Sequence, residues 1–168
     1  RKGYGSLIEG FSNLHKKIPT SRLVIVGRGH LKSRLLKQAK RLGVGDFVHI
    51  ESEMSFPDLA KLYRSVNLVV YPSFYEGQGL IPLEAMSSGV PIVTVDHGPL
   101  PEMVDETVGA LFTMGKIDSM LVALERTLNE EESPKGIQGR KRVVEKFNFD
   151  GNADVFEKIY LEAIQLED

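Results

Sequence analysis

The chain has 168 residues, of which 42% are hydrophobic and 26% are charged, a composition that suits one globular domain with a substantial core. Its 21 basic and 23 acidic residues leave a formal net charge of -2, which argues against a general nucleic-acid surface. Cysteine is absent, which excludes disulfides and thiolate metal sites and is compatible with a reducing compartment. No apolar run approaches the ~20 residues of a membrane-spanning helix. The chain opens within what reads as functional sequence, so we expect a piece of a longer protein.

The first part of the sequence predicts helices that alternate with short strands. Apolar residues recur at helical spacing over residues 7–14, with Ser6 as the expected N-cap. A β-branched strand at residues 22–26 then enters the turn Gly27-Arg28-Gly29-His30, which leads into an amphipathic helix. A strand, Gly-x-Gly and a helix are typical of dinucleotide sites, but the third glycine of that fingerprint is missing, so this interpretation is weak. Arg28 either adds positive charge to a ligand site or faces solvent.

The rest of the chain continues the alternation and then becomes helical. Residues 47–50, 66–71, 92–95 and 109–112 predict strands, and residues 56–64 predict a helix capped by Ser55. Three helical segments follow, beginning near residues 118, 135 and 150. The last of these, residues 150–166, is amphipathic.

The stretch from residue 75 to residue 91 organises the chain, because it links two buried strands through a loop and a helix. Gly77 and Gly79 stand just after the first of these strands, where they permit a backbone turn and the close approach of a ligand. Pro82 is tolerated in the first turn of a helix, so we expect the helix to begin near Gly79 or Leu80. Its free amides then point to the carboxyl end of the sheet and favour an anion such as a phosphate.

Two carboxylates flank this amide cluster. Glu76 precedes the glycines, and Glu84 falls in the first turns of the helix. A carboxylate accepts hydrogen bonds well from neighbouring hydroxyls of a sugar or a ribose. Either glutamate alone is explained as a solvated residue or as a complement to the helix dipole. The combination is more specific and predicts a site for a sugar nucleotide. It consists of the two glutamates, both glycines, Pro82 and the Gly-Val-Pro at residues 89–91.

These residues resemble the signature of retaining glycosyltransferases of the GT-B fold, in family four, the glycosyl transferases group 1. The signature has two glutamates separated by seven residues, within E-G-F-G-L-x-x-L-E-A-M-A-x-G-x-P-V-V. The chain departs from it at Gln78, which replaces the phenylalanine and leaves open whether the donor preference is altered. The matching stretch reads Glu76-Gly77-Gln78-Gly79-Leu80-Ile81-Pro82-Leu83-Glu84-Ala85-Met86-Ser87-Ser88-Gly89-Val90-Pro91-Ile92-Val93.

The resemblance covers essentially the whole chain and implies a fold. The fold would be α/β, a doubly wound parallel sheet with helices on both faces, which is the Rossmann-like half of a GT-B enzyme. Residues 1–168 would form a single nucleotide-sugar-binding domain, the C-terminal half of a two-domain enzyme whose N-terminal half binds the acceptor. The resemblance further implies a cytoplasmic location or one at the cytoplasmic face of a membrane, with any membrane association made through the N-terminal half.

The resemblance also implies a reaction and roles for individual residues. The full-length enzyme would transfer a hexose, with retention, from a nucleoside diphosphate sugar to a glycan, lipid or small-molecule acceptor, and the isolated domain would be inactive. Glu76 and Lys2 would be catalytic: Glu76 orients the donor sugar and Lys2 reaches its diphosphate, while Glu84 binds the ribose. Neither metal nor cofactor is expected, since amides and Lys or Arg neutralise the diphosphate. The implied donor-binding residues are Arg1, Lys2, Gly29, Glu76, Gly77, Gly79, Leu80, Ile81 and Glu84.

Three other functions stay open. The first is a GT-B-like sugar-nucleotide epimerase, which the reaction product would distinguish. The second is a sugar-nucleotide-binding module that is inactive on its own. The third is a hydrolase that uses Glu76 and Glu84 as an acid and base pair. We rank it last, because a glycosidase does not need a phosphate-binding helix start between its carboxylates.

Overall fold

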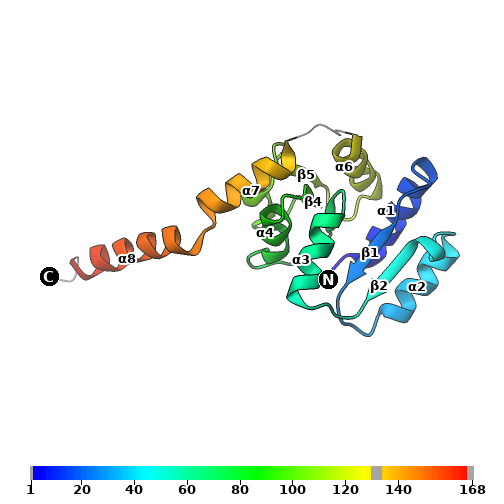
Figure 1. Ribbon diagram of the computed structural model, residues 1–168, viewed down its shortest axis with the longest axis horizontal. Helices are drawn as coiled ribbons and strands as arrows, with labels where there is room; N and C mark the ends of the chain where they lie inside the picture. The colour runs from blue at the N-terminus through cyan, green and yellow to red at the C-terminus, as the bar shows by residue number, and fades with distance from the viewer. Residues whose placement is uncertain (1, 130–133, 166–168) are drawn as a thin grey trace.

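The computed structural model describes residues 2–129 and 134–165, and within these ranges five short strands alternate with helices (Figure 1). Strands β1 (Leu23–Val26) and β2 (Val48–Glu51) form a parallel pair, with Leu23 opposite Val48. Strands β3 (Val69–Tyr71), β4 (Ile92–Val95) and β5 (Gly109–Phe112) form a parallel triplet in that order. A helix stands between each strand and the next, which is what a parallel connection requires.

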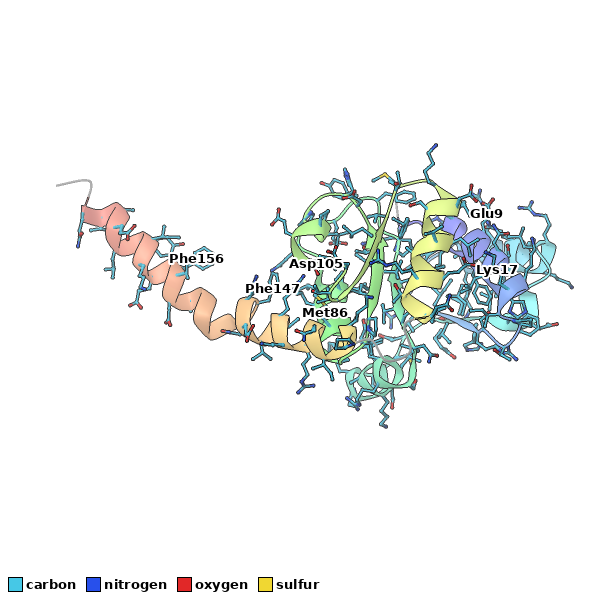
Figure 2. The ribbon with its side chains drawn as sticks, turned by 90° about the horizontal axis from the view of Figure 1, so that it is seen from above. Glu9, Lys17, Met86, Asp105, Phe147 and Phe156 are labelled. Carbon is cyan, nitrogen blue, oxygen red and sulfur yellow. The ribbon has the colours of Figure 1, made fainter. Side chains whose placement is uncertain are left out.

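Helices cover both faces of the strands, which confirms the predicted fold class. Helix α1 (Tyr4–Lys17) packs against α2 (Lys32–Arg41) and α6 (Ile117–Asn129). On the other face, α4 (Leu80–Ser87) packs against α5 (Leu100–Met103) and α7 (Lys135–Lys146). Met86 of α4 lies beside α7 (Figure 2). The short helix η1 (Gly45–Phe47) precedes β2, and α3 (Phe56–Ser65) connects β2 to β3.

Two apolar clusters form the core, and α1 joins them. The larger cluster surrounds β3, β4 and β5 and includes Leu7 and Leu14 from α1. The smaller cluster lies around β1, β2 and α2 and includes Ile8 and Phe11 from α1. Burial of a large apolar side chain stabilises a fold by about 1.5–3 kcal/mol. Since α1 buries such side chains in both clusters, it holds the two parts of the domain together.

The two predicted helix caps had different outcomes. Ser55 caps α3 as predicted, with its hydroxyl accepting the Asp58 amide at 3.3 Å. The Ser6 prediction was wrong, because the N-cap of α1 is Gly3 and the helix begins at Tyr4, three residues earlier than a Ser6 cap would place it. Gly3 has φ 67° and lies so close to Pro72 that an added β-carbon would overlap the Pro72 carbonyl oxygen. The contact between the start of α1 and the end of β3 therefore sets where the helix begins.

Helix α8 (Phe149–Gln165) extends away from the rest of the domain (Figure 1). Its described side chains are all exposed, and they include the apolar Val155, Phe156, Ile159, Leu161 and Ile164. Phe156 lies far from the sheet in the view from above (Figure 2). Within the described ranges, no helix is both long enough and apolar enough to cross a membrane.

Candidate functional site

The structure brings Lys2 and Glu76 together, although they lie 74 positions apart in the sequence. Lys2 comes just before α1, and Glu76 lies in the loop that follows β3. The Lys2 Nζ is 3.4 Å from the Glu76 Oε2, and the two side chains are 53% and 19% exposed. The loop after β4 lies beside this pair, since an added β-carbon on Gly98 would be 3.7 Å from the Glu76 carbonyl oxygen. The pair thus stands at the carboxyl end of the strands, where ligands bind in open α/β sheets.

Both oxygens of the Glu76 carboxylate are held by neighbouring groups. The Tyr71 hydroxyl donates to Oε2, and the Gly77 amide donates to Oε1 at 3.3 Å. Lys2 also reaches the Tyr71 hydroxyl oxygen, at 3.4 Å from its Nζ. Tyr71, Lys2 and Glu76 therefore form one connected cluster at the end of β3.

The cluster shifts the ionisation of its members. The hydrogen bond from Tyr71 is the largest cause that lowers the pKa of Glu76, and the charge of Lys2 adds to it. Burial lowers the pKa of Lys2, but the Tyr71 and Glu76 contacts together outweigh it and raise that pKa. Burial and the bond to Glu76 both raise the pKa of the Tyr71 hydroxyl. At neutral pH the cluster therefore holds an ammonium, a neutral phenol and a carboxylate.

Helix α4 begins as the sequence predicts, and its first turn is open to a ligand. Its N-cap is Gly79, which adopts the left-handed conformation with φ 78° and is buried against Leu100 and Met103. No side chain caps this helix start. The amides of Leu80 and Ile81 in the first turn have no partner within the helix, so an external acceptor can satisfy them.

Glu84 is exposed on α4 and is also held by a tyrosine. Its Oε2 accepts a hydrogen bond from the Tyr63 hydroxyl of α3 at 2.8 Å. Burial raises the pKa of Tyr63, and the Glu84 carboxylate raises it further. The second glutamate is thus fixed where α3 and α4 meet.

The other predicted site residues have different positions. Gly29 is exposed in the loop after β1, and an added β-carbon there would meet no atom within 4 Å. Its neighbour Arg28 forms an ion pair with Glu53, with both side chains mostly exposed, which favours the solvent-facing interpretation of Arg28. The predicted Arg1 lies outside the described residues.

Sequence reasoning missed Tyr71 and Tyr63, which hold the two glutamates. The sequence pattern places Tyr71 at the end of the strand predicted at residues 66–71 and Tyr63 in the helix predicted at residues 56–64, and it indicates a partner for neither hydroxyl. A hydroxyl at the end of an otherwise aliphatic strand was the available signal, because a buried tyrosine usually directs its hydroxyl to a polar partner. Among the residues that the structure describes, no three His, Asp or Glu side chains gather as a metal site would require.

Comparison with known proteins places this geometry in a family. Residues 1–143 match the family model of the glycosyl transferases group 1. The MMP alpha-(1->4)-mannosyltransferase of Mycolicibacterium hassiacum is 37% identical over 132 residues, which cover 76% of this chain and 32% of the relative. Sucrose-phosphate synthase from Thermosynechococcus elongatus has a similar structure, with a TM-score of 0.84 and 26% identity, over 99% of this chain and 43% of that one.

A further solved structure carries a nucleotide. It is a mutant of TarM from S. aureus in complex with fondaparinux, alpha-GlcNAc-glycerol and UDP, with a TM-score of 0.82 and 26% identity, over 92% of this chain and 32% of that chain. The present chain spans less than half of the length of the curated relatives it matches. The likeness to these structures confirms the predicted Rossmann-like GT-B half. The chain belongs to the glycosyl transferases group 1 family.

Proposed function

We propose that this chain is the donor-binding, C-terminal half of a retaining glycosyltransferase that takes a hexose from a nucleoside diphosphate sugar. One observation carries the proposal: Lys2 stands 3.4 Å from Glu76 at the end of β3, next to a helix start that no side chain caps. A cation and free amides suit a diphosphate, and a carboxylate suits sugar hydroxyls. A sugar nucleotide presents both chemistries within one molecule.

The proposed roles follow from the charges at the site. The amides of Leu80 and Ile81 and the Lys2 ammonium would stabilise the diphosphate as negative charge develops on it during departure. Glu76, ionised and held from two sides, would accept hydrogen bonds from the donor sugar. Glu84, farther along α4, would accept from the ribose hydroxyls. These donors would neutralise the leaving group without a metal, so we propose no cofactor.

The comparisons support this reading at the level of the family. The TarM structure holds UDP, and the mannosyltransferase relative is named for sugar transfer. Because the chain spans only part of such relatives, we propose that a second domain supplies the acceptor site. The identity of the hexose, the base and the acceptor would be settled by binding and turnover assays.

The electrostatics weigh against a hydrolase that uses Glu76 as its acid. A glycosidase acid needs a raised pKa so that it carries a proton near neutral pH. Tyr71 and Lys2 instead lower the pKa of Glu76. An epimerase would need the same donor contacts, so product analysis with the full-length protein distinguishes it from a transferase.

The direct test is a titration of this chain with UDP, GDP and ADP and with their sugars, followed by amide chemical shifts. We expect the largest shifts at Lys2, Glu76, Gly79, Leu80 and Ile81. The exposed helix α8 serves as an internal control, since its amides should stay unchanged. Shifts confined to residues outside 76–84 would show that the diphosphate binds elsewhere.

Turnover tests the proposed second domain. We expect this chain alone to transfer no sugar at a useful rate, because positioning of the acceptor can account for ~7–11 kcal/mol of a barrier. The measurement compares the chain with its full-length protein, using the donor that binds best and a mixture of acceptors. Comparable turnover by the chain alone would contradict the proposal that the acceptor site lies elsewhere.

A further inference from the structure

Tyr71 is placed between the two residues to which we assign the donor's sugar and diphosphate. Its hydroxyl donates to the Glu76 Oε2 and lies 3.4 Å from the Lys2 Nζ. These partners are five and 69 positions away in the sequence, so one phenol links the loop after β3 to the segment before α1. Neither the resemblance nor the family match assigns this tyrosine a role.

The ring of Tyr71 is anchored, so its hydroxyl has little freedom to move. The residue is 5% exposed and belongs to the larger apolar cluster. Its carbonyl oxygen accepts a hydrogen bond from the Thr94 hydroxyl at 2.8 Å, which ties the end of β3 to β4. The packing holds the ring, and the hydroxyl alone reaches the polar cluster.

The contacts around Glu76 leave a defined part of its carboxylate for a ligand. An ionised carboxylate offers about four acceptor positions. Tyr71 and Lys2 take two of them at Oε2, and the Gly77 amide takes one at Oε1. The remaining position lies on Oε1, so the surrounding groups determine which oxygen faces a sugar hydroxyl.

We propose that Tyr71 is a positioning residue that fixes the Glu76 carboxylate for the donor sugar and holds Lys2 beside it. The inference rests on the proposed function, because that function assigns Glu76 to the sugar and Lys2 to the diphosphate. Tyr71 acts through these two side chains. Loss of its hydroxyl should therefore weaken the sugar nucleotide more than the nucleotide alone, because Lys2 contacts both ligands and Glu76 contacts only the sugar.

The test uses Tyr71→Phe, which keeps the buried ring and removes only the hydroxyl. Calorimetry compares UDP with UDP-glucose and GDP with GDP-mannose, and yields the ratio of the two affinities in each pair. Loss of a hydrogen bond to a charged group predicts that this ratio falls about tenfold in Tyr71→Phe. The matched control is Tyr63→Phe, which removes the equivalent hydroxyl from Glu84 and should weaken nucleotide and sugar nucleotide by the same factor.

A second measurement needs no ligand and separates the two proposals. A carboxyl carbon NMR titration of the free protein should show the pKa of Glu76 rising in Tyr71→Phe and staying unchanged in Tyr63→Phe. If no sugar nucleotide binds the unmodified chain, the proposed function fails, and this titration still shows whether the Tyr71 hydroxyl holds the Glu76 carboxylate. An unchanged pKa of Glu76 and an unchanged affinity ratio in Tyr71→Phe would overturn the inference.

Loss of folding in Tyr71→Phe would not end the test. Glu76→Gln leaves Tyr71 in place and removes the charge that its hydroxyl faces. In a chain labelled at the tyrosine ring carbons, the pKa of Tyr71 should then fall, because Glu76 helps to raise it. A Tyr71 titration that Glu76→Gln leaves unchanged would contradict the contact on which the inference rests.

Discussion

Two loops in this domain follow parallel strands and lead into helices, yet they are built differently. The loop after β1 contains Gly29, which is exposed and has open space around it, beside an Arg28 paired with Glu53 on the surface. The loop after β3 ends at Gly79, which is left-handed and buried, and it carries a Glu76 held by groups from two other segments. The glycines in the sequence make the two loops look equivalent. The packing shows that the first loop is an open turn and that the second is held in place by contacts with other segments.

The largest expected difference between the loops concerns their glycines. Gly79→Ala should destabilise the fold by about 2–3 kcal/mol, because alanine resists the left-handed conformation and its β-carbon would lie 3.1 Å from Leu100. Gly29→Ala is the matched control and should change the free energy of unfolding by less than about 0.5 kcal/mol. Urea denaturation of both variants provides the comparison, and similar losses would mean that the first loop is as constrained as the second.

The carboxylates of the second loop and its helix should separate by ligand. Glu84→Ala should weaken binding of a nucleoside diphosphate by roughly 1.5–3 kcal/mol, since a charge-assisted hydrogen bond to the ribose is lost. Glu76→Ala should cost a similar amount only when the sugar is attached. Calorimetry with UDP and UDP-glucose measures both. Equal losses for the two variants with UDP alone would contradict the division of roles.

The pH dependence of stability should also differ between the loops. Because the folded state lowers the pKa of Glu76 below its ordinary value of 4.5, its ionised form stabilises the fold above that pH. This contribution should be lost as the pH falls through the lowered value. Denaturation measures the free energy of unfolding of the wild type and of Glu76→Gln between pH 7 and pH 3. The difference between the two proteins should shrink as the pH falls. Glu53→Gln, which removes the partner of Arg28 from the segment after β2, is the control. A difference that stays constant with pH would show that Glu76 gains nothing from its partners.

The smallest effect is expected at Arg28. Its ion pair with Glu53 is mostly exposed, so Arg28→Ala should change stability by less than about 0.5 kcal/mol. Nucleotide affinity should also change little, whereas Lys2→Ala should weaken it clearly. If Arg28→Ala instead weakened UDP binding as much as Lys2→Ala, the first loop would face the donor as well.

The sequence by itself determined the features that depend on local chemistry. The start of α4 at Gly79 and the Ser55 cap of α3 were both predicted. Each depends only on residues close together in the sequence: a glycine that can adopt the left-handed conformation, and a hydroxyl three residues before its amide partner. The parallel order of β3 and β4 followed from two buried strands joined through a helix. The two glutamates and their glycines also lie close together in the sequence, so the family could be named from this stretch alone.

Only the tertiary structure decided what holds the site together. Lys2 and Tyr71 meet across 69 positions, and Tyr63 reaches Glu84 across 21, distances at which spacing in the sequence carries no geometric information. The start of α1 at Gly3 likewise depends on its contact with Pro72, which no local pattern near Ser6 could indicate. The sequence gives the type of each side chain. The hydrogen-bond partner of its polar atoms depends on how strands and helices that are distant in the sequence pack against each other.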